Sequence, residues 1–175
     1  MDALTSLPNR RCFDEVVEVE FADACRSGQP LALVMLDVDY FKRYNDLYGH
    51  PEGDRCLQQV AQAIESAARR PRDFVARYGG EEMVMVLPDT DAAGAVVVAE
   101  AARQAVVNLF VPHLTHPMGH VTVSAGAAVH VRDKKVQTPQ DLLQQADLAL
   151  YRAKELGRNQ VVIQDVLPLP SKTAI

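Results

Sequence analysis

The sequence lacks three features that would assign it to other classes of protein: a long apolar run, a paired-cysteine motif and a surplus of positive charge. Its longest unbroken apolar stretch covers residues 31–36, far short of a membrane span, and no segment has the pattern of a signal peptide. Cys12, Cys25 and Cys56 include no C-x-x-C pair. We therefore expect thiols in a reducing compartment, and neither a zinc site nor a disulfide framework.

Acidic residues outnumber basic ones, at 23 Asp and Glu against 18 Lys and Arg, for a net charge of −5. A protein that binds long nucleic acid usually carries a basic surface, so this class is excluded. A small nucleotide remains compatible, because metal ions can supply the positive charge that its phosphates need. The 175 residues, 48% of them hydrophobic, contain no repeat and suit one globular domain with its own core.

Apolar periodicity and turn residues predict elements in the order α-β-α-β-β-α-β-α-β. We expect helices over about residues 8–26, 52–69, 89–110 and 138–157, a short helical turn at 41–48, and strands over residues 31–39, 73–78, 82–87, 121–130 and 159–164. The central β-α-β-β-α-β order is that of a ferredoxin-like α+β fold, an antiparallel sheet with helices mainly on one face. The domain is expected over residues 1–164, followed by a C-terminal tail, 165–175.

Two acidic clusters fall where that fold would bring them together. Asp37 and Asp39 end the first apolar strand, and Glu81 and Glu82 follow a double glycine at the predicted hairpin tip. Singly, such residues usually belong to a turn or a solvated edge. The first and third strands are neighbours in this fold, so we expect Asp37 and Glu81 to lie side by side. Carboxylates with a backbone carbonyl suit Mg²⁺, and two such ions can stabilise an attacking and a leaving oxygen.

Other polar residues have both a functional and a structural interpretation. Asn45 and Asp54 can bond the Watson–Crick edge of guanine, or they can cap a turn and favour a helix dipole. Spacing alone favours the structural interpretation. Lys154 and Arg158 can hold triphosphate oxygens, but cations are also favoured at a helix C-terminus. For the Phe-Lys pair at residues 41–42, a buried ring and a solvated lysine are the default.

Taken in order, six segments resemble the motifs of the GGDEF family of diguanylate cyclases. The likeness extends from Asp2 to about Val162. The matching segments are residues 2–11 (DALTSLPNRR), 36–50 (LDVDYFK followed by ND and YGH), 53–54 (GD), 77–83 (RYGGEEM), 121–126 (VTVSAG) and 149–159 (ALYRAK followed by GRN). One position departs from the family pattern, since Met83 stands where the family has Phe. Methionine is an adaptable apolar residue, so we expect activity to survive.

The resemblance implies a palm-type nucleotidyl cyclase fold and gives each site residue a role by position. Asp37, the Val38 carbonyl and Glu81 would bind Mg²⁺, with Mn²⁺ as an alternative, at two ions per active site. Glu82 would help hold the second ion, and Glu81 would assist proton removal, which makes these two glutamates the catalytic candidates. The expected substrate-binding residues are Phe41, Lys42, Asn45, His50, Asp54, Gly79, Gly80, Lys154 and Arg158. Of these, Asn45 and Asp54 would read guanine, with His50 nearby.

The same resemblance implies a reaction between two domains in an antiparallel homodimer. Each domain would hold one GTP, and the pair would form cyclic di-GMP and release pyrophosphate. Arg70 and Asp73 match the family's R-x-x-D product-inhibition site in its place before the double glycine, so cyclic di-GMP is expected to inhibit. The abrupt start at Asp2 predicts a domain cut from a longer protein with an N-terminal sensor. We expect a cytoplasmic domain, whose full-length protein could be membrane-anchored.

The sequence also allows three other interpretations. A family member without catalysis could sense cyclic di-GMP through Arg70 and Asp73, or GTP through the active site. The intact residues Asp37, Glu81, Glu82 and Lys154 favour an enzyme. Another palm-type enzyme, such as a different nucleotidyl cyclase or a polymerase, is also compatible with the acidic pattern. The small size and the lack of a basic face argue against a polymerase. A purely structural role is the least favoured, because many polar residues converge on one sheet edge.

Overall fold

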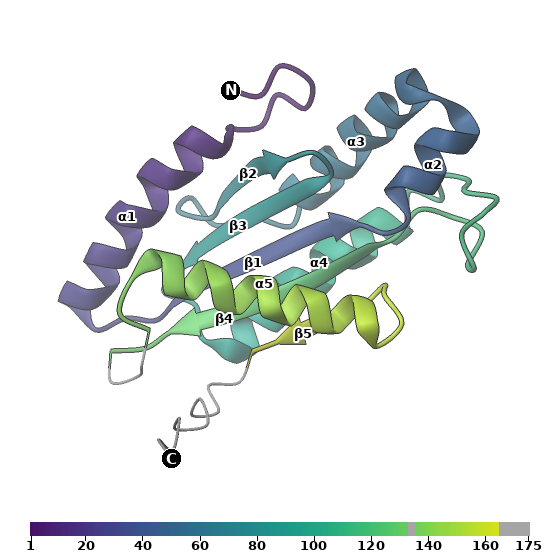
Figure 1. The fold of residues 1–175 in the computed structure, drawn as a ribbon. Helices are drawn as coiled ribbons and strands as arrows, with labels where there is room; N and C mark the ends of the chain where they lie inside the picture. The colour runs from purple at the N-terminus through teal and green to yellow at the C-terminus, as the bar shows by residue number, and fades with distance from the viewer. Residues whose placement is uncertain (133–135, 165–175) are drawn as a thin grey trace, which may run out of the picture.

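The computed structural model describes residues 1–132 and 136–164 of the chain, and Figure 1 shows its helices and strands. In chain order these are α1 (Arg10–Ser27), β1 (Leu31–Val38), α2 (Phe41–Tyr48), α3 (His50–Glu65), β2 (Phe74–Gly79), β3 (Glu82–Pro88), α4 (Ala92–Val107), β4 (Val123–His130), α5 (Pro139–Glu155) and β5 (Val161–Ile163). The predicted order is confirmed, with residues 41–48 forming a full helix. The expected tail, 165–175, lies outside the described residues.

Two predicted helices were too long. The helix expected at 52–69 is α3, which ends at Glu65, so Pro71 does not end it. Tight backbone turns close it, with the amide of Ala67 donating to Ile64 at 3.1 Å. The helix expected at 89–110 is α4, which begins only after Asp91. The Asp91 carboxylate accepts from the Gly94 amide at 2.8 Å and caps the helix there.

The five strands form one sheet in the order β2-β3-β1-β4-β5 (Figure 1). The first four strands are antiparallel neighbours in the ferredoxin-like order. β5 is parallel to β4, so the sheet is mixed and not wholly antiparallel. β1 lies at the centre, and all eight of its residues are buried. This burial explains why its apolar residues run continuously instead of alternating with polar ones.

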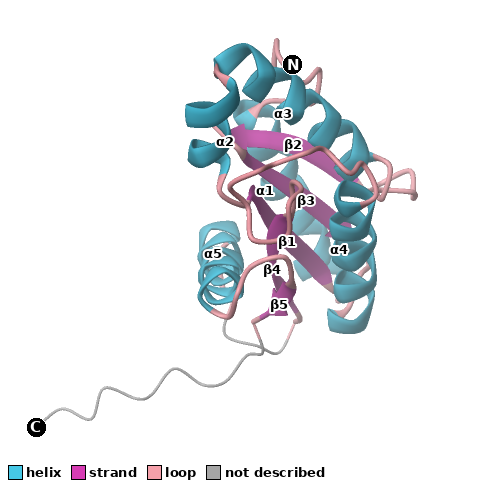
Figure 2. Ribbon diagram, turned by 90° about the vertical axis from the view of Figure 1, so that its right-hand side faces the viewer, coloured by secondary structure: helices cyan, strands magenta, loops and turns pink. Residues whose placement is uncertain are grey.

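Helices cover both faces of the sheet, which corrects the expectation that they pack mainly on one. Figure 2 shows the sheet between α5 on one side and α4 on the other. Alternate residues of β1 face the two sides. Leu33 packs in one cluster with Phe13 of α1 and Leu150 of α5, while Val34 packs in the other with Ile64 of α3. α1 and α5 flank the central β-α-β-β-α-β unit in the chain, and they cover the face that this unit leaves open.

Gly126 of β4 sets how closely α5 approaches the sheet. A Cβ at this position would lie 2.0 Å from the Leu150 amide nitrogen and 2.4 Å from the Ala146 carbonyl oxygen. Both atoms belong to the α5 backbone, which cannot rotate away as a side chain could. Only glycine therefore allows this packing. Because α5 also carries Lys154, the same contact positions part of the candidate site described below.

We expect Gly126→Ala to destabilise the domain by about 1–3 kcal/mol or more, since the added methyl overpacks against backbone. For a domain of this size each kcal/mol lowers Tm by about 2–4 °C, which thermal unfolding followed by circular dichroism would detect. Gly79→Ala is the matched control, because a Cβ there has no heavy atom within 4 Å. Equal melting temperatures for the two variants would contradict the close-packing argument.

Candidate active site

The two predicted acidic clusters meet where β1 ends beside the β2–β3 hairpin. In the antiparallel register Asp37 of β1 lies directly opposite Glu82 of β3. Glu81 lies one step further along, where its carbonyl oxygen accepts from the Val38 amide at 3.4 Å. The structure thus brings Asp37 and Glu81 to the same edge of the sheet, with Glu82 as the direct cross-strand partner of Asp37. Three carboxylates gather at this edge.

Burial opposes the charged form of two of these carboxylates. Burial raises the pKa of Asp37, the neighbouring Glu81 and Asp39 carboxylates add to the rise, and a hydrogen bond from Lys154 opposes it. Burial also raises the pKa of Glu82, and the negative charges of Asp37 and Asp147 add to it. A divalent cation would stabilise this arrangement, because it favours the ionised form of every carboxylate that it contacts. The residues present therefore fit a cation such as Mg²⁺.

No group of three or more His, Cys, Asp or Glu side chains within residues 1–132 and 136–164 is arranged to hold a metal ion. Asp37, Glu81 and Glu82 therefore do not converge as a three-carboxylate site, and the donors on offer are one or two of these carboxylates beside the backbone of Val38. Mg²⁺ commonly takes only one or two carboxylates from the protein and completes its shell with water and substrate phosphates. The set is thus suited to a metal that arrives with a phosphorylated substrate.

Lys154 connects α5 to the acidic cluster. Its Nζ lies 2.8 Å from Asp37 Oδ1, and the lysine side chain is 32% exposed. The sequence placed Lys154 with the phosphate-binding residues. The structure places its ammonium group directly beside the Asp37 carboxylate, where it offsets negative charge.

The guanine-recognition candidates lie on α2 and α3. Asn45 of α2 has a buried side-chain oxygen without a hydrogen-bond partner among the described residues. A Cβ on Gly53 of α3 would lie 1.8 Å from that oxygen, so glycine leaves the space that the amide uses. Asp54 and His50 are exposed on the first turns of α3. An unpaired buried acceptor calls for a donor, and the N–H groups of guanine provide such donors.

The remaining residues of the predicted substrate set differ in exposure. Phe41 is only 8% exposed and belongs to the core, as its structural interpretation predicted, while Lys42 is exposed. Gly79 and Gly80 are exposed at the hairpin tip, and Gly80 has a φ of +52° that favours glycine. Met83, the departure from the family pattern, is fully buried opposite Leu36. It fills core space and presents no polar group to the site.

An N-terminal turn supports the hairpin. In the sequence, this turn showed only as part of a motif. The Asp2 carboxylate accepts from the Thr5 amide at 2.8 Å and from Arg77 Nη1 at 3.1 Å. Arg77 also donates from Nη2 to the Gly80 carbonyl oxygen at 2.8 Å. The start of the chain is thus connected to the double-glycine tip through one guanidinium.

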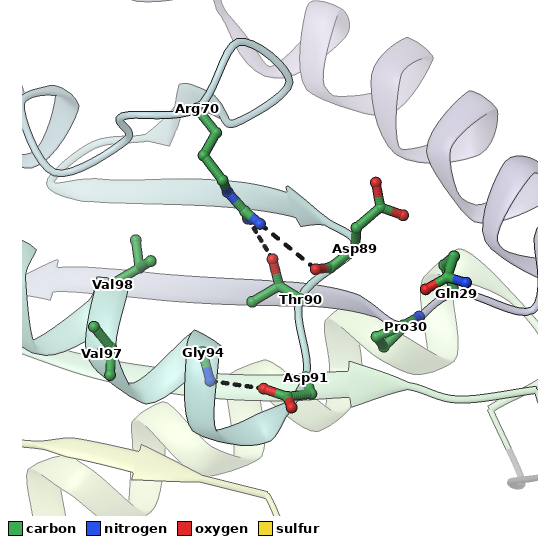
Figure 3. Close-up of a pocket in the computed structure, with 9 residues that line it drawn as sticks. All are labelled: Gln29, Pro30, Arg70, Asp89, Thr90, Asp91, Gly94, Val97 and Val98. Atoms are coloured by element: carbon green, nitrogen blue, oxygen red, sulfur yellow. Dashed lines mark hydrogen bonds between the residues drawn. The ribbon is translucent and has the colours of Figure 1, made fainter.

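Arg70 and Asp73 lie away from the acidic cluster, at the opposite end of β3. Arg70 Nε donates to Asp73 Oδ1 at 3.0 Å, and the guanidinium also donates to the Pro88 carbonyl oxygen at 3.2 Å and to the Thr90 hydroxyl. Figure 3 shows Arg70 extending across a pocket toward Asp89 and Thr90. The structure therefore separates this pair from the other predicted site residues.

No helix among the described residues has the length and apolarity needed to span a membrane.

The predicted site residues form two groups and one isolated pair. The first group is the acidic edge with Lys154, the second is the Asn45 region of α2 and α3, and Arg70 with Asp73 is the isolated pair.

Comparisons with known proteins identify the family of the chain. The family model for "Diguanylate cyclase, GGDEF domain" matches residues 1–160. Diguanylate cyclase DgcM of Escherichia coli K12 is 40% identical over 161 residues, which cover 92% of this chain and 37% of that protein. Response regulator PleD of Caulobacter vibrioides is 38% identical over 162 residues, covering 92% and 35%. The chain spans a little over a third of the length of these curated relatives.

Solved structures give the same result. The GGDEF domain of DgcB from Caulobacter crescentus, solved in complex with c-di-GMP, superposes with a TM-score of 0.85 at 35% identity, covering 94% of this chain and 93% of that one. The active GGEEF domain of a diguanylate cyclase from Vibrio cholerae gives 0.77 at 34% identity, covering 91% and 99%. On sequence and fold, the chain belongs to the GGDEF-domain family of diguanylate cyclases.

Proposed function

We propose that this domain condenses two GTP molecules into cyclic di-GMP with release of pyrophosphate. The observation that carries the proposal is the acidic edge, where Asp37, Glu81 and Glu82 gather beside Lys154. The Vibrio cholerae relative is described as an active GGEEF domain, and this chain has the same two glutamates after its double glycine. The Met83 difference lies in the core, so it leaves the polar surface of the edge intact.

The acidic edge would hold the metal. Asp37, the Val38 carbonyl and Glu81 are the proposed ligands of one Mg²⁺, or Mn²⁺ in its place, and Glu82 would help hold a second. When bound, these ions supply the positive charge that phosphoryl transfer needs at the attacking and leaving oxygens. Glu81 is our candidate acceptor for the proton of the attacking 3′-hydroxyl, which would attack the α-phosphorus of the other GTP.

Substrate binding would divide between the two groups of polar residues. The Asn45 oxygen and the Asp54 carboxylate would accept from the Watson–Crick edge of guanine, with His50 nearby. Lys154 and Arg158 would bind the triphosphate, together with Lys42, Phe41 and the exposed backbone of Gly79 and Gly80. Such a site acts mostly by positioning the reactants and stabilising charge.

Two domains would complete one active site. Each domain would bind one GTP, so the hydroxyl of one substrate would meet the phosphate of the other only in an antiparallel homodimer. The curated relatives are about two and a half times as long as this chain, and we propose that an N-terminal sensor domain controls this pairing in a longer protein. The catalytic domain would work in the cytoplasm, where GTP is available.

We expect cyclic di-GMP to form from GTP and Mg²⁺ with a specific rate that rises with protein concentration, because the reactive unit is a dimer. Chromatographic measurement of product across a wide range of protein concentrations checks this. A specific rate independent of concentration would contradict catalysis by a dimer that assembles in solution. If no cyclic di-GMP forms at any concentration, the domain is better interpreted as a nucleotide-binding module without catalysis.

Asp37→Asn and Glu81→Gln are expected to lower turnover by on the order of a hundredfold or more, as does loss of one charge-stabilising group in other enzymes. Each variant removes one negative charge from the acidic edge while keeping the side-chain shape. Glu65→Gln is the matched control, since it removes an exposed charge at the far end of α3. Wild-type turnover in either site variant, with the fold verified by circular dichroism, would exclude the metal assignment.

We also propose that cyclic di-GMP inhibits through Arg70 and Asp73. Arg70 lines two pockets, and arginine suits bidentate contacts with guanine or phosphate. The Asp73 side chain is 2% exposed and holds Arg70 in place. A ligand would therefore meet a guanidinium whose orientation is already fixed.

Arg70→Ala is expected to raise the inhibition constant for cyclic di-GMP about tenfold to a hundredfold, the loss expected for one or more hydrogen bonds to a charged group. Initial turnover without added product should stay near the wild-type value, because Arg70 lies at the other end of β3. Arg69→Ala is the control, since Arg69 is the exposed neighbouring arginine. Equal inhibition of the Arg70 and Arg69 variants would refute the proposed site.

A further inference from the structure

The carboxylate of Asp39 is almost fully buried, at 1% exposure, and has no part in the mechanism above. Its Oδ1 accepts from the Ser124 hydroxyl at 2.7 Å. Its Oδ2 accepts from the Thr122 hydroxyl at 2.6 Å and from the Asn159 backbone amide at 3.1 Å. A buried carboxylate needs such donors to offset the loss of water. Asp39 thus joins the end of β1 to β4 and to the turn that follows α5.

That turn carries Arg158 in an unfavourable backbone conformation. Arg158 and Asn159 have φ values of +63° and +47°, in the left-handed region that non-glycine residues rarely adopt. Such a conformation persists where its surroundings hold it. Here the Arg158 amide donates to the Ala153 carbonyl at 3.0 Å, and the next amide donates to Asp39. The backbone around Arg158 is therefore fixed from both sides.

The aromatic ring of Tyr40 fixes the other end of Arg158. The guanidinium carbon lies 4.5 Å from the centre of the Tyr40 ring, within cation–π distance. The Tyr40 ring also packs against His116 in a T-shaped pair, with a centroid distance of 4.9 Å and an interplanar angle of 87°. His116 Nε2 lies 2.9 Å from the Thr122 hydroxyl. Since that hydroxyl donates to Asp39, the imidazole is the donor to it, and one network supports both the ring and the turn.

We infer that Asp39 and Tyr40 are positioning residues that orient Arg158 toward the triphosphate of the substrate. This inference rests on the proposed function, because it takes GTP as the ligand. Stacking occupies the face of the guanidinium and leaves its N–H groups, which lie in the plane, free for phosphate oxygens. Holding the side chain and its backbone beforehand also reduces the entropy that binding would otherwise cost.

The test measures equilibrium binding of 3′-deoxy-GTP with Mg²⁺ by calorimetry, since this analogue lacks the attacking hydroxyl and cannot react. Tyr40→Leu is expected to weaken its binding about two- to fivefold, the effect of one exposed cation–π contact. Tyr40→Phe keeps the ring and should restore wild-type binding. Binding of 3′-deoxy-GMP, which lacks the two outer phosphates, should be equal in all three proteins.

A double-mutant comparison tests whether Tyr40 acts through Arg158. In an Arg158→Gln background, Tyr40→Leu should cause no further loss of 3′-deoxy-GTP affinity. Asp39→Asn should likewise weaken the triphosphate and not the monophosphate. Where Asp39→Asn lowers the folded fraction, Ser124→Ala, which removes one hydrogen bond to the carboxylate, is measured in its place.

The outcomes distinguish a failure of this inference from a failure of the proposed function on which it rests. A wild-type chain that binds neither analogue would refute the proposed function, and the inference with it. A wild-type chain that binds both analogues, with triphosphate affinity unchanged by Tyr40→Leu, would overturn the positioning role alone. The same holds if Tyr40→Leu weakens both analogues equally, or adds a full further loss when Arg158 is absent.

Discussion

The burial of β1 is the constraint on which the rest of the structure depends. All eight residues of this strand are buried, and it is paired along both edges and covered on both faces. Its apolar sequence requires those neighbours. Asp37 is the next-to-last residue of the strand and Asp39 follows its end, so the packing that buries the strand also draws two carboxylates into a partly apolar region. Hydrogen bonds and an ion pair at the site offset the loss of hydration of these carboxylates.

The burial of the two aspartates is offset in different ways. The difference indicates a structural role for Asp39 and a metal-binding role for Asp37. Asp39 accepts three hydrogen bonds from groups that the fold supplies, so it acts as an internal anchor. Asp37 has one described partner, Lys154, and faces Glu82 across the sheet. Its position lacks the donors that would satisfy a buried carboxylate. It is therefore the aspartate suited to a cation.

The length of β3 separates the two proposed ligand sites. Glu82 begins the strand, and Pro88, whose carbonyl accepts from Arg70, ends it. Six residue steps correspond to roughly 20 Å. A ligand bound beside Arg70 would therefore not reach the acidic edge of the same chain. Inhibition from that position would have to act through the arrangement of the two domains rather than by filling the substrate site.

The sequence by itself determined the family, the order of elements and the composition of the acidic edge, because these follow from local patterns. The apolar run of β1, the double glycine and the capping box at Thr138 each act over a few residues. It did not determine the covering of both sheet faces, the parallel β5 or the end of α3 at Glu65. It also assigned no role to Asp39. These features depend on contacts between residues far apart in the chain, and only tertiary packing brings such residues together.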